Sequence, residues 1–314
     1  MMKSRGAAVI GAFVLIALAI FVRGLLVDDD GGGGGSNGPG KDDDGPPVVA
    51  CTPELMAVCD ALAAEGDISD TKAARKVRTL DLEGASAPDS KIDGWITWDP
   101  APQIANFDAG QNEVWAESEA LGSARLAALL DPATADALTA ACRRDTVWAC
   151  VAEAPVAGLT IGVGEPDTAE GLSRLYPLAA ALTADLDAQA LDANDLRDLV
   201  KGPTSQADAE TMARSATQPG QVSIVVGPEV VLGRIGSSAQ GQNRKLRTSV
   251  AKPKTTATIV IAPRSGRDVG DLADACEDDD VAEALRAAGV EPCSDDRDDV
   301  DRAGFLYLVR EKAS

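Results

Sequence analysis

The chain of 314 residues contains no histidine, and only 3% of its residues are aromatic. The absence of histidine excludes Ser-His-Asp and Cys-His nucleophile systems, HExxH metalloenzymes, Cys/His zinc sites and acid–base catalysis by imidazole. Carboxylates are the remaining acid–base groups, and no motif combines them with a cofactor-binding or metal-binding pattern. We therefore expect a protein that is not an enzyme and that carries no cofactor and no metal.

Basic residues are also outnumbered, because 29 Lys and Arg face 50 Asp and Glu, which gives a net charge of −21. A chain this acidic is a poor ligand for nucleic acid, whose phosphates require a basic surface. It is equally unsuited to lying flat on anionic lipid. Charged residues make up 25% of the chain and hydrophobic residues 45%, which is typical of a globular protein.

An apolar run lies close to the N-terminus. Lys3 and Arg5 precede an uncharged stretch at 6–22, which as a helix would be roughly 25 Å long. Arg23 can snorkel to the interface and so extend the span to Val27. The charges on either side predict a cytoplasmic tail at 1–5, a single-pass transmembrane signal anchor at 6–27 and an extracellular remainder at the cell membrane. The alternative is a cleaved signal peptide with its small-x-small site at 17–19.

The next segment, 28–47, consists of Gly, Asp and Pro at 17 of its 20 positions. Nothing in it can bury apolar surface, so we expect a solvated linker. The folded part is predicted to begin at residue 48.

The six cysteines fall into three local couples separated by long stretches without cysteine. An even number of cysteines in an exported chain favours disulfides over a metal site, for which no CxxC spacing is present. Six cysteines allow fifteen connectivities. The spacing favours pairing in order: Cys51 with Cys59, Cys142 with Cys150, and Cys276 with Cys293.

Apolar segments of strand length alternate with segments of helical pattern. The expected strands are 47–51, 76–80, 92–98, 159–164, 222–226 and 258–263, and the expected helices are 55–64, 132–143, 169–184 and 281–288. This alternation predicts an α/β fold with mainly parallel sheets.

Three ordered segments of the folded part carry a family resemblance: VVACTPEL at 48–55, DGWITWDP at 93–100 and VGEPDTAEGL at 163–172. With them the chain resembles the extracytoplasmic solute-binding proteins of the type 2 periplasmic-binding class, as found beside transporters in high-GC Gram-positive bacteria. The resemblance covers 48–314 and implies a two-lobed periplasmic-binding-protein-like fold (type 2) after the N-terminal transmembrane helix. Lobe 1 would contain 48–113 and 258–314, and lobe 2 would contain 114–257. The chain departs from the family in lacking a lipid-anchor cysteine, a role that the membrane helix would take over.

In open α/β sheets, ligands bind beyond the carboxyl ends of the strands. This rule gives a set of candidate ligand-binding residues: Thr52, Glu54, Thr97, Trp98, Asp99, Asp167, Thr168 and Glu229. Trp95 and Trp98 lie on opposite sides of their strand, so that one is in the core and the other lines the cleft, or both belong to the core.

Thr168 opens a helix, where free N–H groups and a hydroxyl can receive an anion. The alternative is that Thr168 or Asp167 only caps this helix. We expect the solute to be a zwitterion or a small monoanion, with Trp98 covering its apolar face.

Two charge blocks stand out near the C-terminus. The block at 234–267 contains eight Lys or Arg and no acid, whereas the block at 268–301 contains fourteen acids and two Arg. They are interpreted as solvated faces that offset one another, or the basic block as a surface for an anion or a partner.

Three functional hypotheses follow. The first is a membrane-tethered extracellular solute-binding protein that captures a small polar ligand between two lobes and has a transporter or a surface protein as partner. The second is a cell-surface interaction or sensor module on the same fold, with its cleft filled by its own side chains. The third is a carboxylate enzyme such as a glycoside hydrolase, for which few aromatic residues are available.

Overall fold

The computed structural model describes residues 47–64, 78–110, 112–142, 147–183, 186–201, 208–218, 220–250, 254–297 and 302–313. The predicted cytoplasmic tail, the predicted membrane anchor and all of the predicted linker except Pro47 lie outside the described residues. Among the helices that are described, none has the length and apolar character needed to cross a membrane. Residues 45–314 form one unit, separate from 1–44.

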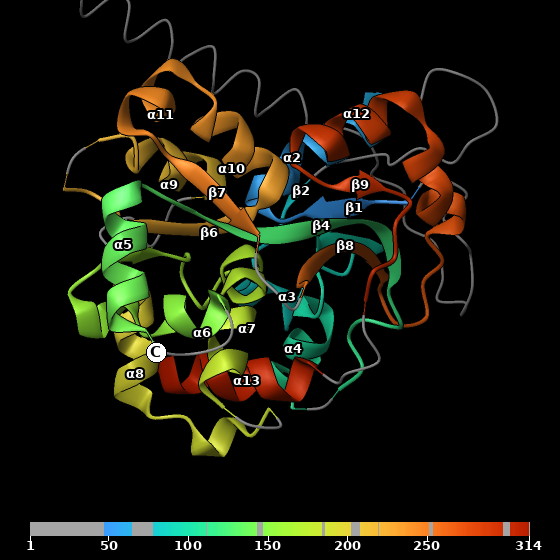
Figure 1. Cartoon of the computed structure of the whole chain (residues 1–314). Helices are drawn as coiled ribbons and strands as arrows, with labels where there is room; N and C mark the ends of the chain where they lie inside the picture. The colour runs from blue at the N-terminus through green and yellow to red at the C-terminus, as the bar shows by residue number, and fades with distance from the viewer. Residues whose placement is uncertain are drawn as a thin grey trace, which may run out of the picture. The chain divides into compact units, whose positions relative to one another are not determined.

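The strands follow the order β2-β1-β3-β8-β4-β6-β5, with β7 and β9 also paired to β4 (Figure 1). Their bounds are β1 Val49–Cys51, β2 Arg78–Thr79, β3 Gly94–Trp98, β4 Glu119–Leu130, β5 Ile161–Gly162, β6 Ile224–Pro228, β7 Arg247–Val250, β8 Thr256–Pro263 and β9 Glu291–Pro292. Pairs β1–β2, β1–β3 and β5–β6 are parallel, and the pairs made by β4 and β8 are antiparallel. The prediction of mainly parallel sheets is therefore wrong, because two long strands run against their neighbours.

Strand β4 belongs to two sheets. Its first part, from Glu119 to Arg125, pairs with β8, and its second part, from Leu126 to Leu130, pairs with β6 and β7. We call the elements around β1, β2, β3 and β8 lobe 1, and those around β5, β6 and β7 lobe 2. Gly122 lets β9 approach β4 closely, because a Cβ at this position would lie 2.5 Å from the Glu291 carbonyl oxygen.

The helices cover both lobes. Their bounds are α2 Met56–Ala64, α3 Leu82–Ala85, α4 Ala101–Asp108, α5 Pro132–Ala141, α6 Val147–Ala152, α7 Ala169–Leu182, α8 Ala193–Val200, α9 Ala209–Ser215, α10 Glu229–Gly236, α11 Ala239–Arg244, α12 Asp279–Ala287 and α13 Arg302–Ala313, with 3-10 turns at Pro53–Leu55, Ala154–Ala157, Ala188–Ala190 and Gly270–Glu277. The predicted helices correspond to α2, α5, α7 and α12, and the predicted strands to β1, β2, β3, β5, β6 and β8.

Helix α13 contacts elements from both lobes. It packs against α4 on one side and against α7 and α8 on the other (Figure 1). The Arg310 guanidinium makes a two-pronged ion pair with the Asp108 carboxylate, with Nη1 donating to Oδ2 at 2.7 Å. Although the sequence assigns 302–313 to lobe 1, this helix therefore also contacts lobe 2.

Three disulfides join the cysteines in sequence order: Cys51–Cys59, Cys142–Cys150 and Cys276–Cys293. The predicted pairing is confirmed. Each bridge closes a loop within one lobe, so none of the three ties lobe 1 to lobe 2.

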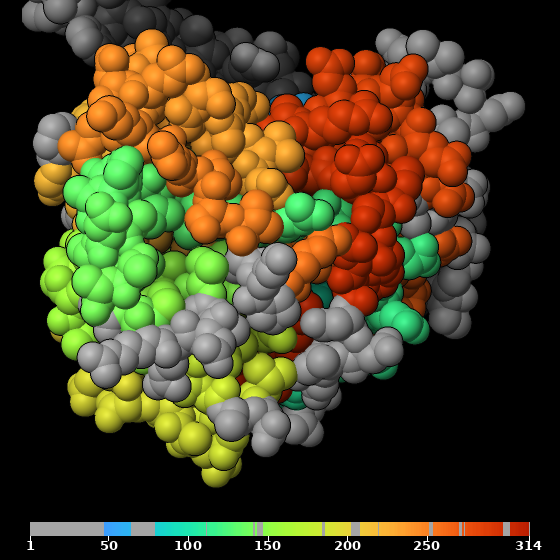
Figure 2. All heavy atoms as spheres, viewed as in Figure 1, coloured from blue at the N-terminus to red at the C-terminus, as the bar shows by residue number. Residues whose placement is uncertain are grey.

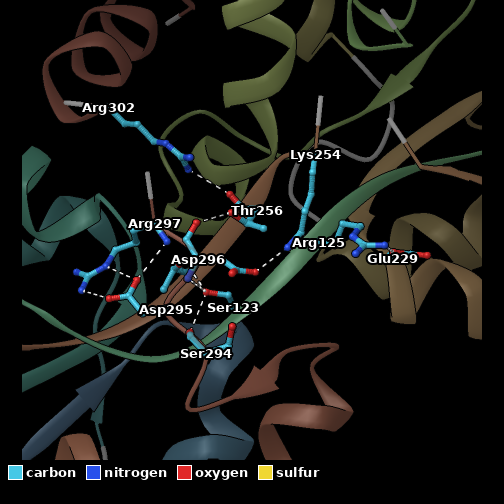
Figure 3. Close-up of polar contacts among 11 residues, drawn as sticks. Ser123, Arg125, Glu229, Lys254, Thr256, Ser294, Asp295, Asp296, Arg297 and Arg302 are labelled. Atoms are coloured by element: carbon cyan, nitrogen blue, oxygen red, sulfur yellow. Dashed lines mark hydrogen bonds and ion pairs between the residues drawn. The ribbon is translucent and has the colours of Figure 1, made fainter. Parts of the chain in front are cut away.

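The chain that follows β9 lies across both long strands (Figure 3). The Ser123 hydroxyl of β4 donates to the Ser294 carbonyl oxygen at 2.9 Å and accepts from the Asp296 N–H at 3.0 Å. On β8, the Thr256 hydroxyl donates to the Asp296 carbonyl oxygen at 3.0 Å. The Asp296 carboxylate also pairs with Lys254 at 2.9 Å, which directly links the basic and acidic blocks. We call the segment 294–296 the strap. It holds β4 and β8 together where they run from lobe 1 towards lobe 2.

The two lobes contact one another beyond their shared strand. The Arg234 Nη2 of α10 donates to the Ala287 carbonyl oxygen of α12 at 3.5 Å. Figure 2 shows the orange atoms around α10 and the red-orange atoms around α12 meeting on the same face of the molecule. The lobes therefore touch one another on this face of the molecule.

Candidate functional site

Two neighbouring cavities lie between the lobes, with volumes of about 430 Å³ and about 260 Å³. Both are lined by Glu54 from lobe 1 and by Glu170 and Asp208 from lobe 2. Trp98, Glu210 and Arg214 line only the larger cavity, and Thr52, Asp81, Thr168 and Arg174 line only the smaller one. The shared residues make the cavities parts of one acidic site.

The ends of strands and the starts of helices bring these side chains together. Thr52 and Glu54 follow β1, and Trp98 is the last residue of β3. Asp208 caps α9 by accepting from the Thr211 N–H at 2.7 Å. Pro228, the last residue of β6, also lines the larger cavity. The site therefore lies beyond the carboxyl ends of strands from both lobes, as the rule for open α/β sheets requires.

Glu54 is the lining residue whose ionisation is most clearly perturbed. Burial and, to a smaller extent, the nearby Glu170 carboxylate together raise the pKa of Glu54 from 4.5 to about 7, while a backbone N–H, Arg174 and the Thr52 hydroxyl act to lower it. The Oε1 atom of Glu54 is buried and has no hydrogen-bond partner. At neutral pH this carboxyl is therefore close to its midpoint of ionisation.

Glu170 and Arg174 form a buried pair one turn apart on α7. The Arg174 Nη2 lies 3.4 Å from the Glu170 Oε2, and the Glu170 Oε1 accepts from the Ala209 N–H at 3.2 Å. Burial raises the pKa of Glu170, while Arg174 and the Ala209 N–H oppose this effect. Gly164 leaves room for the guanidinium, because a Cβ there would lie 2.5 Å from the Arg174 Nη2, and its φ of +99° suits glycine.

Several buried polar atoms around the site have no partner in the described protein. They include the Thr97 Oγ1 and the Trp98 Nε1. Thr97 is fully buried and Trp98 is 3% exposed. A buried indole N–H or hydroxyl without a partner costs free energy, so these atoms call for a hydrogen-bond partner that the described protein does not provide.

The structure separates the candidate residues of the sequence into two groups. Thr52, Glu54, Trp98 and Thr168 line the cavities, and Thr97 is buried next to Trp98. Asp99, Asp167 and Glu229 do not line either cavity. Asp167 is exposed in its turn, and Glu229 forms a surface ion pair with Arg125 at 3.3 Å.

The two tryptophans of β3 have different surroundings. Trp95 is fully buried and packs against Trp115, with ring centroids 5.4 Å apart. Trp98 lines the larger cavity, although its side chain is almost completely buried. The interpretation with one tryptophan in the core and one at the cleft fits this arrangement.

The Thr168 hydroxyl caps α7. It accepts from the Gly171 N–H at 3.0 Å and donates to the Glu165 carbonyl oxygen at 2.9 Å. Because its single donor is already used, Thr168 cannot donate to an anion without breaking this bond. The arrangement favours the capping alternative over the anion-receiving role.

Sequence reasoning missed Glu170, Arg174 and Asp208. Glu170 and Arg174 have the four-residue spacing of a helical ion pair, immediately after a predicted strand and turn. Asp208 has the residue type of an N-cap. These signals occur on many exposed helices, so only the packing of α7 between the lobes shows that the pair lies in a cleft.

The arrangement of this site suits recognition by charge. The Glu170 carboxylate is held by Arg174 and by the Ala209 N–H, whereas the Glu54 Oε1 has no hydrogen-bond partner. Within the described residues, no group of three or more Asp, Glu and Cys side chains is placed to hold a metal ion.

No protein-family model matches the chain, and no curated protein matches it by sequence. Among solved structures, iron-bound HitA from Pseudomonas aeruginosa is similar, with a TM-score of 0.56 and 11% identity over 85% of this chain and 96% of that one. A periplasmic thiamin binding protein is also similar, with a TM-score of 0.54 and 11% identity over 89% of this chain and 100% of that one. At such identities the likeness shows the fold alone: a mixed α/β fold like that of periplasmic binding proteins.

Proposed function

We propose that this chain is an extracellular solute-binding protein that captures a small polar ligand between its two lobes. The observation that carries the proposal is the interlobe site, which is lined from both lobes and contains buried polar atoms without protein partners. Binding proteins of this architecture enclose ligands by closing two lobes around them, and one lobe alone supplies too little contact. The fold of the two similar solved structures agrees with this mode of action.

The proposal includes the cell-surface context expected from the sequence. Residues 6–27 would anchor the chain in the cell membrane, and 28–47 would act as a tether that keeps the lobes outside the cell. In that position the protein would pass its solute to a transporter or report it to a surface protein. Membership of the type found in high-GC Gram-positive bacteria belongs to the same proposal.

The alternative is an interaction or sensor module with a filled cleft. Cavities of about 430 Å³ and about 260 Å³ favour capture, because the side chains of the lobes leave space for a small ligand. Native mass spectrometry of the full-length chain, released from mild detergent micelles, separates the two. A defined additional mass that is lost on collisional activation supports capture. A ligand-free chain that stays so after incubation with an extract of small metabolites supports the module.

A further inference from the structure

The charge of the interlobe site is strongly unbalanced. Five acidic and two basic side chains line the two cavities: Glu54, Asp81, Glu170, Asp208 and Glu210 against Arg174 and Arg214. Both arginines are paired, Arg174 with Glu170 and Arg214 with Glu210. The remaining negative charge belongs to three carboxyl groups, those of Glu54, Asp81 and Asp208.

Two of these three carboxylates have structural partners. Asp81 accepts from the Gly84 N–H at 2.8 Å at the start of α3, and Asp208 accepts from the Thr211 N–H at the start of α9. Glu54 differs from them. Its Oε1 is buried without a hydrogen-bond partner, and Arg174, the basic side chain that acts on it, is already paired with Glu170. A buried carboxylate in this situation is stabilised by a positive charge brought to it.

A second observation is independent of the acids. Trp98, which lines the larger cavity, has a buried indole N–H without a hydrogen-bond partner. An indole N–H can only donate, so it requires an acceptor such as a hydroxyl or carbonyl oxygen. Glu54 lines the same cavity as Trp98.

On the basis of the proposed capture of a solute between the lobes, we propose that the ligand is an organic cation that also carries an oxygen acceptor. Its ammonium group binds at the Glu54 carboxylate, and its oxygen accepts from the Trp98 N–H. An anion would meet the carboxylates of both lobes. A neutral ligand would leave the ionised form of Glu54 without a compensating charge. This ligand class replaces the zwitterion or monoanion that the sequence suggested.

The test uses two series of small molecules. Within each series, the members share a hydroxyl-bearing part and differ in the charge of one end group. Ethanolamine, ethylene glycol and glycolate form the first series, and tyramine, tyrosol and para-hydroxyphenylacetate form the second. Each series contains a cation, a neutral molecule and an anion, and every member carries a hydroxyl. Isothermal titration calorimetry on the full-length chain is expected to show binding at least about tenfold tighter for the cation than for its partners in at least one series.

Variants identify the carboxylate that is responsible. Glu54→Gln keeps the size of the side chain and is expected to remove the preference for the cation. Glu113→Gln, at an exposed glutamate that does not line either cavity, is expected to keep it. Thermal unfolding of both variants confirms that they are folded before binding is compared.

The affinity for the cation is also expected to depend on pH. The charged groups that line the cavities with Glu54 are Asp81, Glu170, Arg174, Asp208, Glu210 and Arg214, and Glu210 also pairs with Arg234 at 2.9 Å. Because Glu54 must ionise to pair with an ammonium, binding should tighten by up to about tenfold from about pH 6 to about pH 8, and Glu54→Gln should lose this dependence.

The possible results of these experiments test different parts of the proposal. Tighter binding of a neutral or anionic member overturns the ligand class and leaves solute capture standing. A cation preference that survives in Glu54→Gln overturns the role of this carboxylate. Absence of binding by all six molecules counts against the ligand class, while the native mass measurement described above decides separately whether any solute is captured.

Discussion

A single carboxyl group, that of Glu54, makes the stability of the folded chain depend on pH. Its pKa is about 7 in the folded state, against an ordinary value of 4.5. Between these two values the folded state binds more protons than the unfolded state, so the free energy of unfolding falls as pH rises. At about 1.4 kcal/mol per pH unit, the loss due to Glu54 is at most about 3 kcal/mol and is complete above the folded pKa. Burial also raises the pKa of Glu170, which adds to the loss.

Glu54→Gln tests this pH dependence, because the substitution removes the titrating carboxyl group but keeps the volume of the side chain. Urea unfolding without ligand is expected to show that the wild type loses more stability than the variant between about pH 5 and about pH 8, so that the variant is the more stable protein at the higher pH. Parallel pH profiles for the two proteins would contradict the raised pKa of Glu54.

Thr168 is the residue for which two roles can be separated most directly. Thr168→Ala removes the cap of α7 and is expected to cost about 1 kcal/mol of stability, while the affinity for the bound cation changes by less than about twofold. Thr168→Ser should restore the stability, because its hydroxyl can make the same bonds. Urea unfolding and calorimetry on the three proteins provide both quantities. A large loss of affinity with unchanged stability would return Thr168 to the ligand-binding role that the sequence suggested.

At the residue scale, the sequence predicted several residues that line the cavities but not the charge of these cavities. Thr52, Glu54 and Trp98 could be predicted because they lie at or just after the carboxyl ends of strands, where ligands bind in open α/β sheets. The acidity of the site could not be predicted, because it arises where Glu170 and Asp208, both far along the chain, meet Glu54. Glu229 was included by the same strand-end rule, yet its side chain turns to Arg125 at the surface.

At the scale of elements, β4 is the strand that organises the fold and the one that the sequence did not reveal. Its first part contains Gly122, Ser123 and Ala124, which lack the β-branched and aromatic side chains that mark strands. The small residues have a structural reason. Gly122 admits the backbone of β9, and the Ser123 hydroxyl bonds to the strap and lies 2.9 Å from the Thr258 Oγ1 of β8.

Ser123→Ala tests whether the strap stabilises the shared strand. The substitution leaves the Ser294 carbonyl and the Asp296 N–H without their partner in a largely buried position, and we expect a loss of about 1–3 kcal/mol in the free energy of unfolding. Ser86→Ala is the control, because the Ser86 hydroxyl makes an exposed bond to the Glu83 carbonyl oxygen and its loss should cost much less. Equal losses in the free energy of unfolding for the two variants would show that the hydrogen bonds between the strap and Ser123 do not stabilise β4.

At the scale of the whole molecule, ligand capture depends on how the two lobes meet. The three disulfides lie within the lobes, so the relative position of the lobes is set by β4, β8, α13 and the contact between α10 and α12. Gly289, which follows α12, is central to that contact. A Cβ at this position would lie 2.8 Å from the Val231 Cγ2 and 3.0 Å from the Pro228 Cβ, both in lobe 2.

Gly289→Ala is therefore expected to hold the lobes apart. Gly110→Ala provides a matched control, because Gly110 follows α4 and has a φ of +72°, close to the +83° of Gly289. Each of the two glycines also donates its N–H to the carbonyl oxygen of the third residue before it at 3.0 Å. The difference is that nothing lies within 4 Å of a Cβ added at Gly110. Both substitutions should cost about 1 kcal/mol of stability, because an L-residue is strained at such a φ. Only Gly289→Ala should also increase the radius of gyration in small-angle X-ray scattering and weaken ligand binding. If both variants scatter and bind alike, the contact at Gly289 does not control the position of the lobes, which is then set by β4, β8, α13 and the contact between α7 and β3.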